Sequence, residues 1–152
     1  MQKLVIFTLG HSNRKIDDFL ELLKINGIEM LVDIRRFPTS KWEQFKRENL
    51  KNTLEAAGVG YEYLGRELGG YRTGGYLKWM KTAMFKKGVR KLLALAREHS
   101  TVIMCAEKLP WMCHRRFLSA HLEKLGEAQI IHIIDRTRTV QQLQLIENRK
   151  TG

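Results

Sequence analysis

Apolar runs of strand length alternate along this chain with stretches in which apolar residues recur at helical spacing. Strands that are joined through helices pair in parallel, with right-handed crossovers. The alternation therefore predicts an α/β fold: a single three-layer domain with a mostly parallel sheet of about five strands flanked by helices. The expected strands are residues 3–9, 29–34, 59–64, 101–106 and 128–134. The expected helices are residues 17–26, 46–57, a segment within 76–99, and 115–125.

Three local features refine this prediction. The strand at 59–64 is short and polar, so we expect it at an edge of the sheet or out of the parallel order. Gly88 is expected to break or bend the helix within 76–99, because glycine is a poor helix former. The domain is expected to span residues 1–134, followed by a C-terminal extension, 135–152, that holds a short helix near 139–147 and a frayed end.

Composition excludes several classes of protein. With 43% apolar and 28% charged residues, the 152-residue chain is typical of a globular domain that buries about 70% of its unfolded surface. No run approaches the roughly 18 apolar residues of a membrane span, so no membrane partner is expected. The N-terminal apolar run lacks a cleavage site and is interpreted as a strand, not a secretory signal. We therefore expect a cytoplasmic protein whose two cysteines, Cys105 and Cys113, are reduced by default.

The charge balance points to the chemistry of the partner. The chain has 27 basic and 16 acidic residues, a formal net charge of +11. Such a field attracts phosphates, nucleic acids and anionic surfaces. The basic residues are spread along the sequence and form no tail, which argues against a disordered polycationic arm. We expect an anionic small molecule or a nucleic acid as the partner.

Polar, reactive and glycine residues gather directly after four of the expected strands. Ligands of open α/β sheets bind beyond the carboxyl ends of the strands, so we expect one site built from these four loops. The candidate catalytic residues are Cys113, His114, His11 and Glu107. The candidate substrate- or anion-binding residues are Ser12, Arg35, Arg66, Arg72 and Arg115. The candidate structural residues are Gly10, Asp33, Pro38, Gly69, Cys105 and Pro110.

The stretch CAEKLPWMCHRR, residues 105–116, is the most specific of these loops. Pro110 suits the first position of a helix. A helix starting there would place Cys113 near a positive helix end, beside arginines that lower a thiol pKa and favour the reactive thiolate. The helical phase would then turn Cys113 away from His114 and Arg115. A later helix start would leave these residues in a loop and remove that objection.

Several of these features have alternative interpretations. Residues 10–13 could form a tight turn with Ser12 as a helix cap, or a nest of amides for a phosphate. Asp33 and Arg35 could be an internal ion pair that fixes a loop. A zinc site from Cys105, Cys113 and histidines is chemically conceivable, but the Cys-x7-Cys-His spacing matches no short structural zinc pattern, and no cofactor or metal is predicted. A disulfide between the two cysteines is the other structural alternative.

Four motifs occur in order along the chain: TLGHS, LVDIRRFP, LGRELGG and CAEKLPWMCHRR. Together they resemble the uncharacterised family numbered 488 among domains of unknown function, over about residues 4–134. The resemblance implies a small cytoplasmic α/β domain and no particular activity. The family's recurring motif positions correspond here to Gly10, His11, Ser12, Asp33, Arg35, Pro38, Gly69, Cys105, Glu107, Pro110, Cys113, His114 and Arg115.

Three functions are compatible with the sequence. The favoured one is an enzyme that acts on a phosphorylated or anionic substrate, such as a nucleotide or nucleic acid, with Cys113 as nucleophile or redox thiol. The second is a nucleic-acid-binding module without chemistry, in which aromatic residues among basic ones stack on bases. Those aromatics, Trp42, Phe45, Trp79 and Phe85, fit core positions at helical spacing slightly better. The third is a structural metal or disulfide module.

Overall fold

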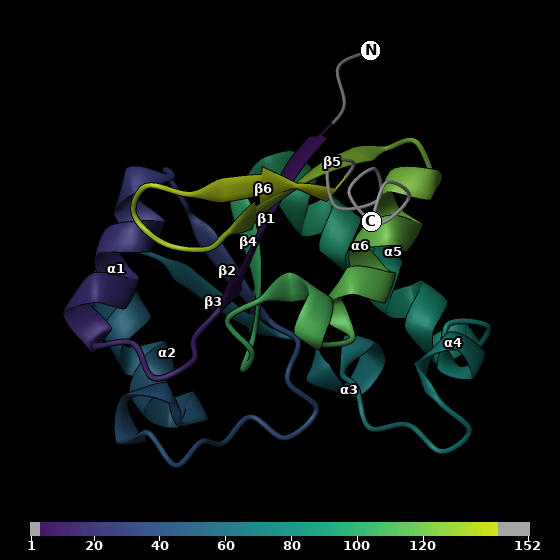
Figure 1. Ribbon diagram of the computed structural model, residues 1–152, viewed down its shortest axis with the longest axis horizontal. Coiled ribbons are helices and arrows are strands. Elements are labelled where there is room, and N and C mark those ends of the chain that lie inside the picture. Colours follow the sequence, from purple (N-terminus) through teal and green to yellow (C-terminus); the bar gives the residue numbers. More distant parts are fainter. Residues whose placement is uncertain (1–3, 143–152) are drawn as a thin grey trace.

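A six-stranded sheet forms the centre of the molecule, in the order β3-β2-β4-β1-β5-β6 (Figure 1). The computed structural model describes residues 4–142. The first five strands in this order pair in parallel, and β6 pairs antiparallel with β5. The strands are β1 (Leu4–Gly10), β2 (Met30–Asp33), β3 (Gly60–Tyr63), β4 (Thr101–Cys105), β5 (Ala128–Ile133) and β6 (Thr139–Gln141). The helices are α1 (Ile16–Ile25), α2 (Arg47–Ala56), α3 (Gly65–Leu68), α4 (Tyr76–Trp79), α5 (Ala83–Glu98) and α6 (Arg115–Lys124), with 3-10 turns η1 (Glu43–Phe45) and η2 (Pro110–Met112).

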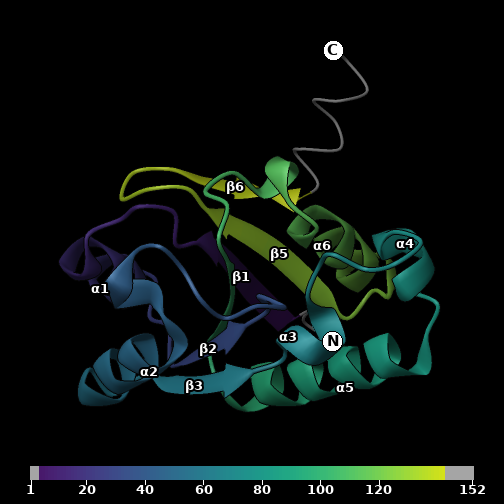
Figure 2. The same ribbon diagram turned by 90° about the horizontal axis from the view of Figure 1, so that it is seen from below.

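Helices cover both faces of the sheet, which confirms the predicted three-layer α/β architecture (Figure 2). On one face α1 and α2 bury Phe19, Leu22 and Leu50 in one apolar core. On the other face α3, α4, α5 and α6 bury a second core that includes Phe85 and Leu118. No helix within residues 4–142 is both long and apolar enough to cross a membrane.

The C-terminal part of the described chain differs from the prediction. A short helix was expected near 139–147, but Thr139–Gln141 forms the sixth strand, paired with β5 through His132 and Val140. Val140 is buried while its two neighbours are exposed, which is the period-two pattern of an edge strand. Gln142 is helical, and the remainder of the expected helix, 143–147, lies outside the described residues. The sheet therefore has one more strand than predicted.

The region 76–99 also differs from the prediction, because Gly88 does not interrupt its helix. Helix α5 runs unbroken through Gly88, and the separation from α4 falls earlier, where Thr82 caps α5 by accepting the Phe85 N–H at 3.2 Å. A side chain on Gly88 would collide with Glu67 and Leu68 of α3. Close packing of α3 on α5 thus explains this glycine. The predicted edge position of the short strand β3 is confirmed.

The strand register brings three predicted site segments to one edge of the sheet. Gly10, the last residue of β1, pairs with Cys105, the last residue of β4. Asp33, the last residue of β2, pairs with Met104 of β4. Because β4 lies between β1 and β2, the loops that follow these three strands leave the sheet side by side. This edge holds the candidate site.

Candidate functional site

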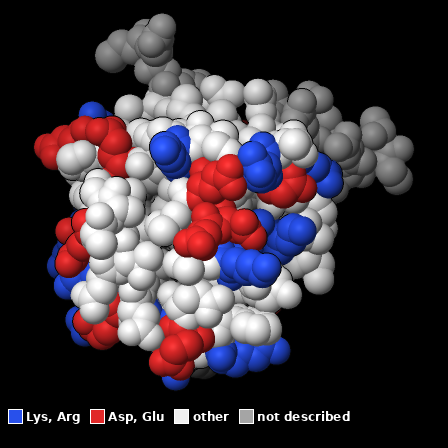
Figure 3. All heavy atoms as spheres, turned by 90° about the vertical axis from the view of Figure 1, so that its left-hand side faces the viewer, with Lys and Arg blue, Asp and Glu red and all other residues white. Residues whose placement is uncertain are grey.

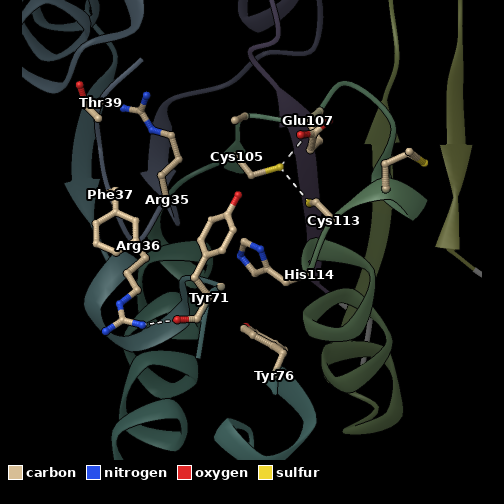
Figure 4. A pocket seen from close by; sticks show the side chains of 13 residues that line it. Arg35, Arg36, Phe37, Thr39, Tyr71, Tyr76, Cys105, Glu107, Cys113 and His114 are labelled. Carbon is tan, nitrogen blue, oxygen red and sulfur yellow. Dashed lines mark hydrogen bonds between the residues drawn. The ribbon is translucent and has the colours of Figure 1, made fainter. Parts of the chain in front are cut away.

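A pocket of about 570 Å³ opens beyond the carboxyl ends of β2 and β4 (Figure 4). Its walls come from three loops, those that follow β2, α3 and β4. Arg36 and Phe37 stand on one side, Cys113 and His114 on the other, and the Tyr71 side chain lies between them. The volume lies within the range of small-molecule sites, roughly 300–1,000 Å³.

The sulfur of Cys113, once ionised, can accept hydrogen bonds from two donors, the Cys105 thiol and the Arg115 backbone N–H. Its Sγ lies 3.1 Å from Sγ of Cys105 and accepts the Arg115 backbone N–H at 3.3 Å. The hydrogen bond from the Cys105 thiol and the positive charge of Arg115 lower the pKa of Cys113 to about 7, against the opposing effect of burial. Donation to Cys113 and burial raise the pKa of the Cys105 thiol, which therefore stays protonated. This pKa brings the ionisation of Cys113 into the neutral pH range.

The local fold decides between the two helix starts considered from sequence. Pro110 begins the 3-10 turn η2, which ends at Met112, and α6 begins only at Arg115. Cys113 lies between the two helices in an extended conformation, with φ −145° and ψ 171°. The later start is the one adopted, so Cys113 and His114 face the same pocket.

Arg115 lies behind the thiol and outside the pocket lining, although the sequence suggested that it binds the substrate anion. Its side chain is fully buried and donates to Thr8 Oγ1 at 3.1 Å and to the carbonyls of Glu107 and Lys108 at 2.9 and 3.2 Å. Within residues 4–142 it forms no ion pair with a carboxylate. It fixes the β4–α6 loop and supplies positive charge to Cys113 from inside the protein.

Asp33 and Arg35 form the buried ion pair that was one of the alternatives from sequence. Arg35 Nη2 lies 2.8 Å from Asp33 Oδ2, and Arg35 Nε donates to Asp33 Oδ1 at 2.9 Å. Arg35 also donates to the Phe45 carbonyl at 2.6 Å, and Tyr61 donates to Asp33 Oδ2 at the same distance. Arg35 touches the pocket, but its guanidinium is occupied by these internal partners.

His11 is packed beside this ion pair and does not line the pocket. Its ring stacks on Phe45 at 4.5 Å, Nδ1 donates to the Ser12 carbonyl at 2.9 Å, and Nε2 faces Arg35 Nη1 at 3.4 Å. Burial lowers the pKa of His11 to about 4, so the ring is neutral. Both nitrogens therefore have structural partners.

His114 and Glu107, the other two candidate acid–base residues, do line the pocket. Burial and the charge of Arg115 lower the pKa of His114 to about 4. Its ring lies 5.0 Å from the Tyr76 ring, and its buried Nε2 has no hydrogen-bond partner among residues 4–142. Glu107 is exposed at the pocket and forms no ion pair in the same part of the chain.

Ser12, Arg66 and Arg72 lie outside the pocket lining. The amides of His11 and Ser12 donate to the carbonyls of Cys105 and Ala106, both at 2.9 Å, so they form no free nest for a phosphate. Ser12 does not cap α1, which begins after Lys15. Arg66 is exposed on α3.

Arg72 holds its own loop together instead of pointing at the pocket. It donates to the carbonyls of Gly69 and Gly65 at 2.9 and 3.1 Å, and its guanidinium lies 3.8 Å from the centre of the Trp79 ring.

Two glycines allow backbones to meet at the site. A Cβ on Gly10 would collide with the Glu107 carbonyl, and a Cβ on Gly69 would meet the Arg36 backbone. This packing agrees with the prediction that Gly10 and Gly69 are structural residues. Pro38 accepts the Arg47 N–H at 3.1 Å, which ties the β2–α2 loop to α2.

Sequence reasoning did not single out the other large side chains that line the pocket. Arg36 stood next to the chosen Arg35, and Phe37 and Tyr71 looked like ordinary loop residues. Tyr71 has a sequence signal in retrospect, because it interrupts the glycine-rich LGGYRTGG stretch. Two of the aromatics weighed for stacking on bases, Phe45 and Phe85, are fully buried core residues.

The region described offers no cluster that would hold a metal ion. Within residues 4–142 no group of three or more His, Cys, Asp and Glu side chains is arranged as a ligand set. The two cysteines are free thiols in this structure.

Comparison with known proteins gives a family but no activity. The model of the family described as "Domain of unknown function DUF488" matches residues 15–122. The chain belongs to this family. No curated protein and no solved structure matches the chain. In this DUF488 domain the match covers β2, β4 and the whole pocket lining, so the site lies within the family region.

Proposed function

We propose that the chain is a thiol-dependent enzyme that acts on a phosphorylated or otherwise anionic substrate, such as a nucleotide or nucleic acid, with Cys113 as the reactive group. One observation carries the proposal: Sγ of Cys113 faces a pocket while Cys105, the Arg115 amide and the Arg115 charge all favour its ionised form. The thiolate is the reactive form in both nucleophilic and redox chemistry.

The neighbouring groups fit a reaction at this sulfur. His114 is neutral and lines the same wall as Cys113, where its ring can exchange a proton with a bound substrate. Glu107 offers a carboxylate at the exposed side of the pocket. Arg36 is the pocket arginine without a carboxylate partner in the described chain, and it supplies the attraction for an anion.

Alkylation by iodoacetamide across a pH series tests the thiol. Mass spectrometry of the Cys113 and Cys105 peptides should give a midpoint near pH 7 for Cys113 and almost no reaction of the buried Cys105 in the folded protein. The Cys113→Ser variant is the control for any reaction elsewhere. A Cys113 midpoint near 9.0, or no reaction of folded protein, would show that thiol catalysis is wrong.

The same samples separate the two competing functions. Two free thiols per chain and no bound metal would exclude a structural metal or disulfide module. A nucleic-acid-binding module would bind short RNA or DNA with a steep linear fall in log affinity against log salt, whatever the state of Cys113. The face formed by α1, α2 and the β5–β6 loop gives this module little support, because acidic and basic side chains alternate there and Arg136 pairs with Glu21 at 3.0 Å (Figure 3).

A further inference from the structure

Two large aromatic side chains stand exposed at the pocket, on loops far apart in sequence. Phe37 follows β2 and is 58% exposed, and Tyr71 follows α3 and is 84% exposed. Their ring centres lie 6.1 Å apart, and both line the pocket (Figure 4). Single exposed apolar residues need no explanation, but a contacting aromatic pair beside a pocket is typical of a ligand site. We call Phe37 and Tyr71 the aromatic rim.

The aromatic rim is held in place by the protein. The Arg36 guanidinium donates to the Tyr71 carbonyl and lies 5.4 Å from the centre of the Phe37 ring. The Arg36 carbonyl in turn accepts the Tyr63 hydroxyl at 2.6 Å. Tyr71 has a φ of 58°, a left-handed conformation that is unfavourable for a residue with a bulky side chain. Strained backbone of this kind is concentrated at ligand-binding and catalytic sites.

The rim and its arginine present two kinds of recognition to one ligand. The faces of Phe37 and Tyr71 can stack on a planar ring, and the neighbouring Arg36 guanidinium, hydrogen-bonded to the Tyr71 carbonyl, carries a positive charge without a carboxylate partner in the described chain. Stacking of a base on an aromatic side chain strengthens binding by about 5- to 150-fold. An anion without a planar ring would gain only the contact with Arg36.

We propose that the aromatic rim binds the base of a nucleotide whose phosphate is held by Arg36, so that a group attached to the nucleotide reaches Cys113. This inference rests on the proposed enzyme function and narrows its substrate class from anions in general to those that carry an aromatic base. The nucleotide unit could come from a free nucleoside phosphate or from single-stranded nucleic acid, because both present a base next to a phosphate.

Calorimetric titration of the full chain with three matched probes tests the rim. Adenosine 5′-monophosphate should bind at least about 5-fold more tightly than ribose 5-phosphate, which lacks the base, and more tightly than adenosine, which lacks the phosphate. A short single-stranded oligoadenylate distinguishes the sources. Tighter binding of the oligomer indicates a nucleic-acid strand, and tighter binding of the monophosphate indicates a free nucleotide.

Variants assign the effect to the rim. Phe37→Ala and Tyr71→Asn should each weaken the binding of adenosine 5′-monophosphate by about 5-fold or more and leave the binding of ribose 5-phosphate unchanged. Asparagine is chosen for position 71 because it tolerates a left-handed φ. Trp42→Ala is the matched control, because Trp42 is 38% exposed and lies outside the pocket lining. It should change neither affinity.

Equal binding of adenosine 5′-monophosphate and ribose 5-phosphate, or no binding of any probe, would overturn the base site. Rim variants that weaken the binding of adenosine 5′-monophosphate and of ribose 5-phosphate equally would also overturn it. The enzyme proposal is decided separately by the pH midpoint of Cys113 alkylation. A lowered midpoint near 7 without nucleotide binding would therefore refute only the base site at the aromatic rim.

Discussion

Replacing Cys105 with alanine removes the thiol that donates to Cys113, and the pKa of Cys113 should rise. The hydrogen bond from Cys105 is the largest of the influences that bring this pKa down from 9.0 to about 7. A hydrogen bond to a charged group contributes about 1.5–3 kcal/mol. At about 1.4 kcal/mol per pKa unit, its loss should raise the pKa of Cys113 by about one to two units.

This change is large enough to measure directly. At pH 7 the thiolate fraction of Cys113 should fall from about one half to between about a tenth and a hundredth. The assay is the pH midpoint of Cys113 alkylation, read from its own peptide by mass spectrometry. Cys105→Ser is the matched control, because a serine hydroxyl at the same position can still donate and should keep the midpoint below that of the alanine variant.

The result that would refute this reasoning is an alanine variant whose midpoint stays near 7. That outcome would mean that the Arg115 amide and charge alone ionise Cys113, and that the 3.1 Å contact between the two sulfurs has no electrostatic effect. A serine variant that behaves like alanine would also count against a hydrogen bond as the cause.

Further predictions concern stability. Arg115→Met should lower the free energy of unfolding by about 2–4 kcal/mol in urea titrations, because Thr8 and two loop carbonyls lose their donor, and should raise the pKa of Cys113; an unchanged urea midpoint would contradict this role. Burial lowers the pKa values of His11, His114 and His132 to about 4. As the pH falls from about 6.5 to 4, the unfolded chain therefore binds protons that the folded chain does not bind. Stability should therefore fall on acidification by up to about 4 kcal/mol per pH unit, and His114→Phe should reduce that slope by about a third, while a flat profile in urea titrations from pH 7 to 5 would show the histidines to be accessible. Gly10→Ala should displace the β4–α6 loop, with a lower melting temperature and slower Cys113 alkylation at pH 7, and an alanine variant with unchanged alkylation would show that the loop can move aside.

Periodicity was sufficient to predict the layers of this fold, and it failed where burial depends on a few contacts. Strands β1, β2 and β4 are continuous apolar runs because helices cover both faces of the sheet. Strand β6 has one buried residue, Val140, and three residues give no period that distinguishes a strand from a helix. Gly88 was misinterpreted because helix propensity is a local quantity, whereas the reason for this glycine is the close approach of α3.

The site was predictable to the level of loops but not of side-chain directions. The rule that ligands bind beyond the carboxyl ends of strands brings Gly10, Asp33 and Cys105 to one edge, as the register requires. It does not say which way a loop arginine turns. Arg72 and Arg115, which lie outside the pocket lining, donate to backbone carbonyls, whereas Arg36 donates to the carbonyl of Tyr71, and both of these residues line the pocket.

The pairing of each arginine with its partners, more than the net charge of +11, determines what the pocket can attract. Arg35 is neutralised by Asp33, so its charge holds the β2–α2 loop and adds little field at the pocket. Arg115 is fully buried without a carboxylate partner among residues 4–142, and a buried cation without an anion is unfavourable. Ionised Cys113 offers that anion, and the guanidinium lowers the thiol pKa in return. Since this attraction is mutual, a ligand or modification that neutralises the thiolate should also weaken the packing of Arg115 against the β4–α6 loop, which couples the chemistry of the sulfur to the shape of the pocket.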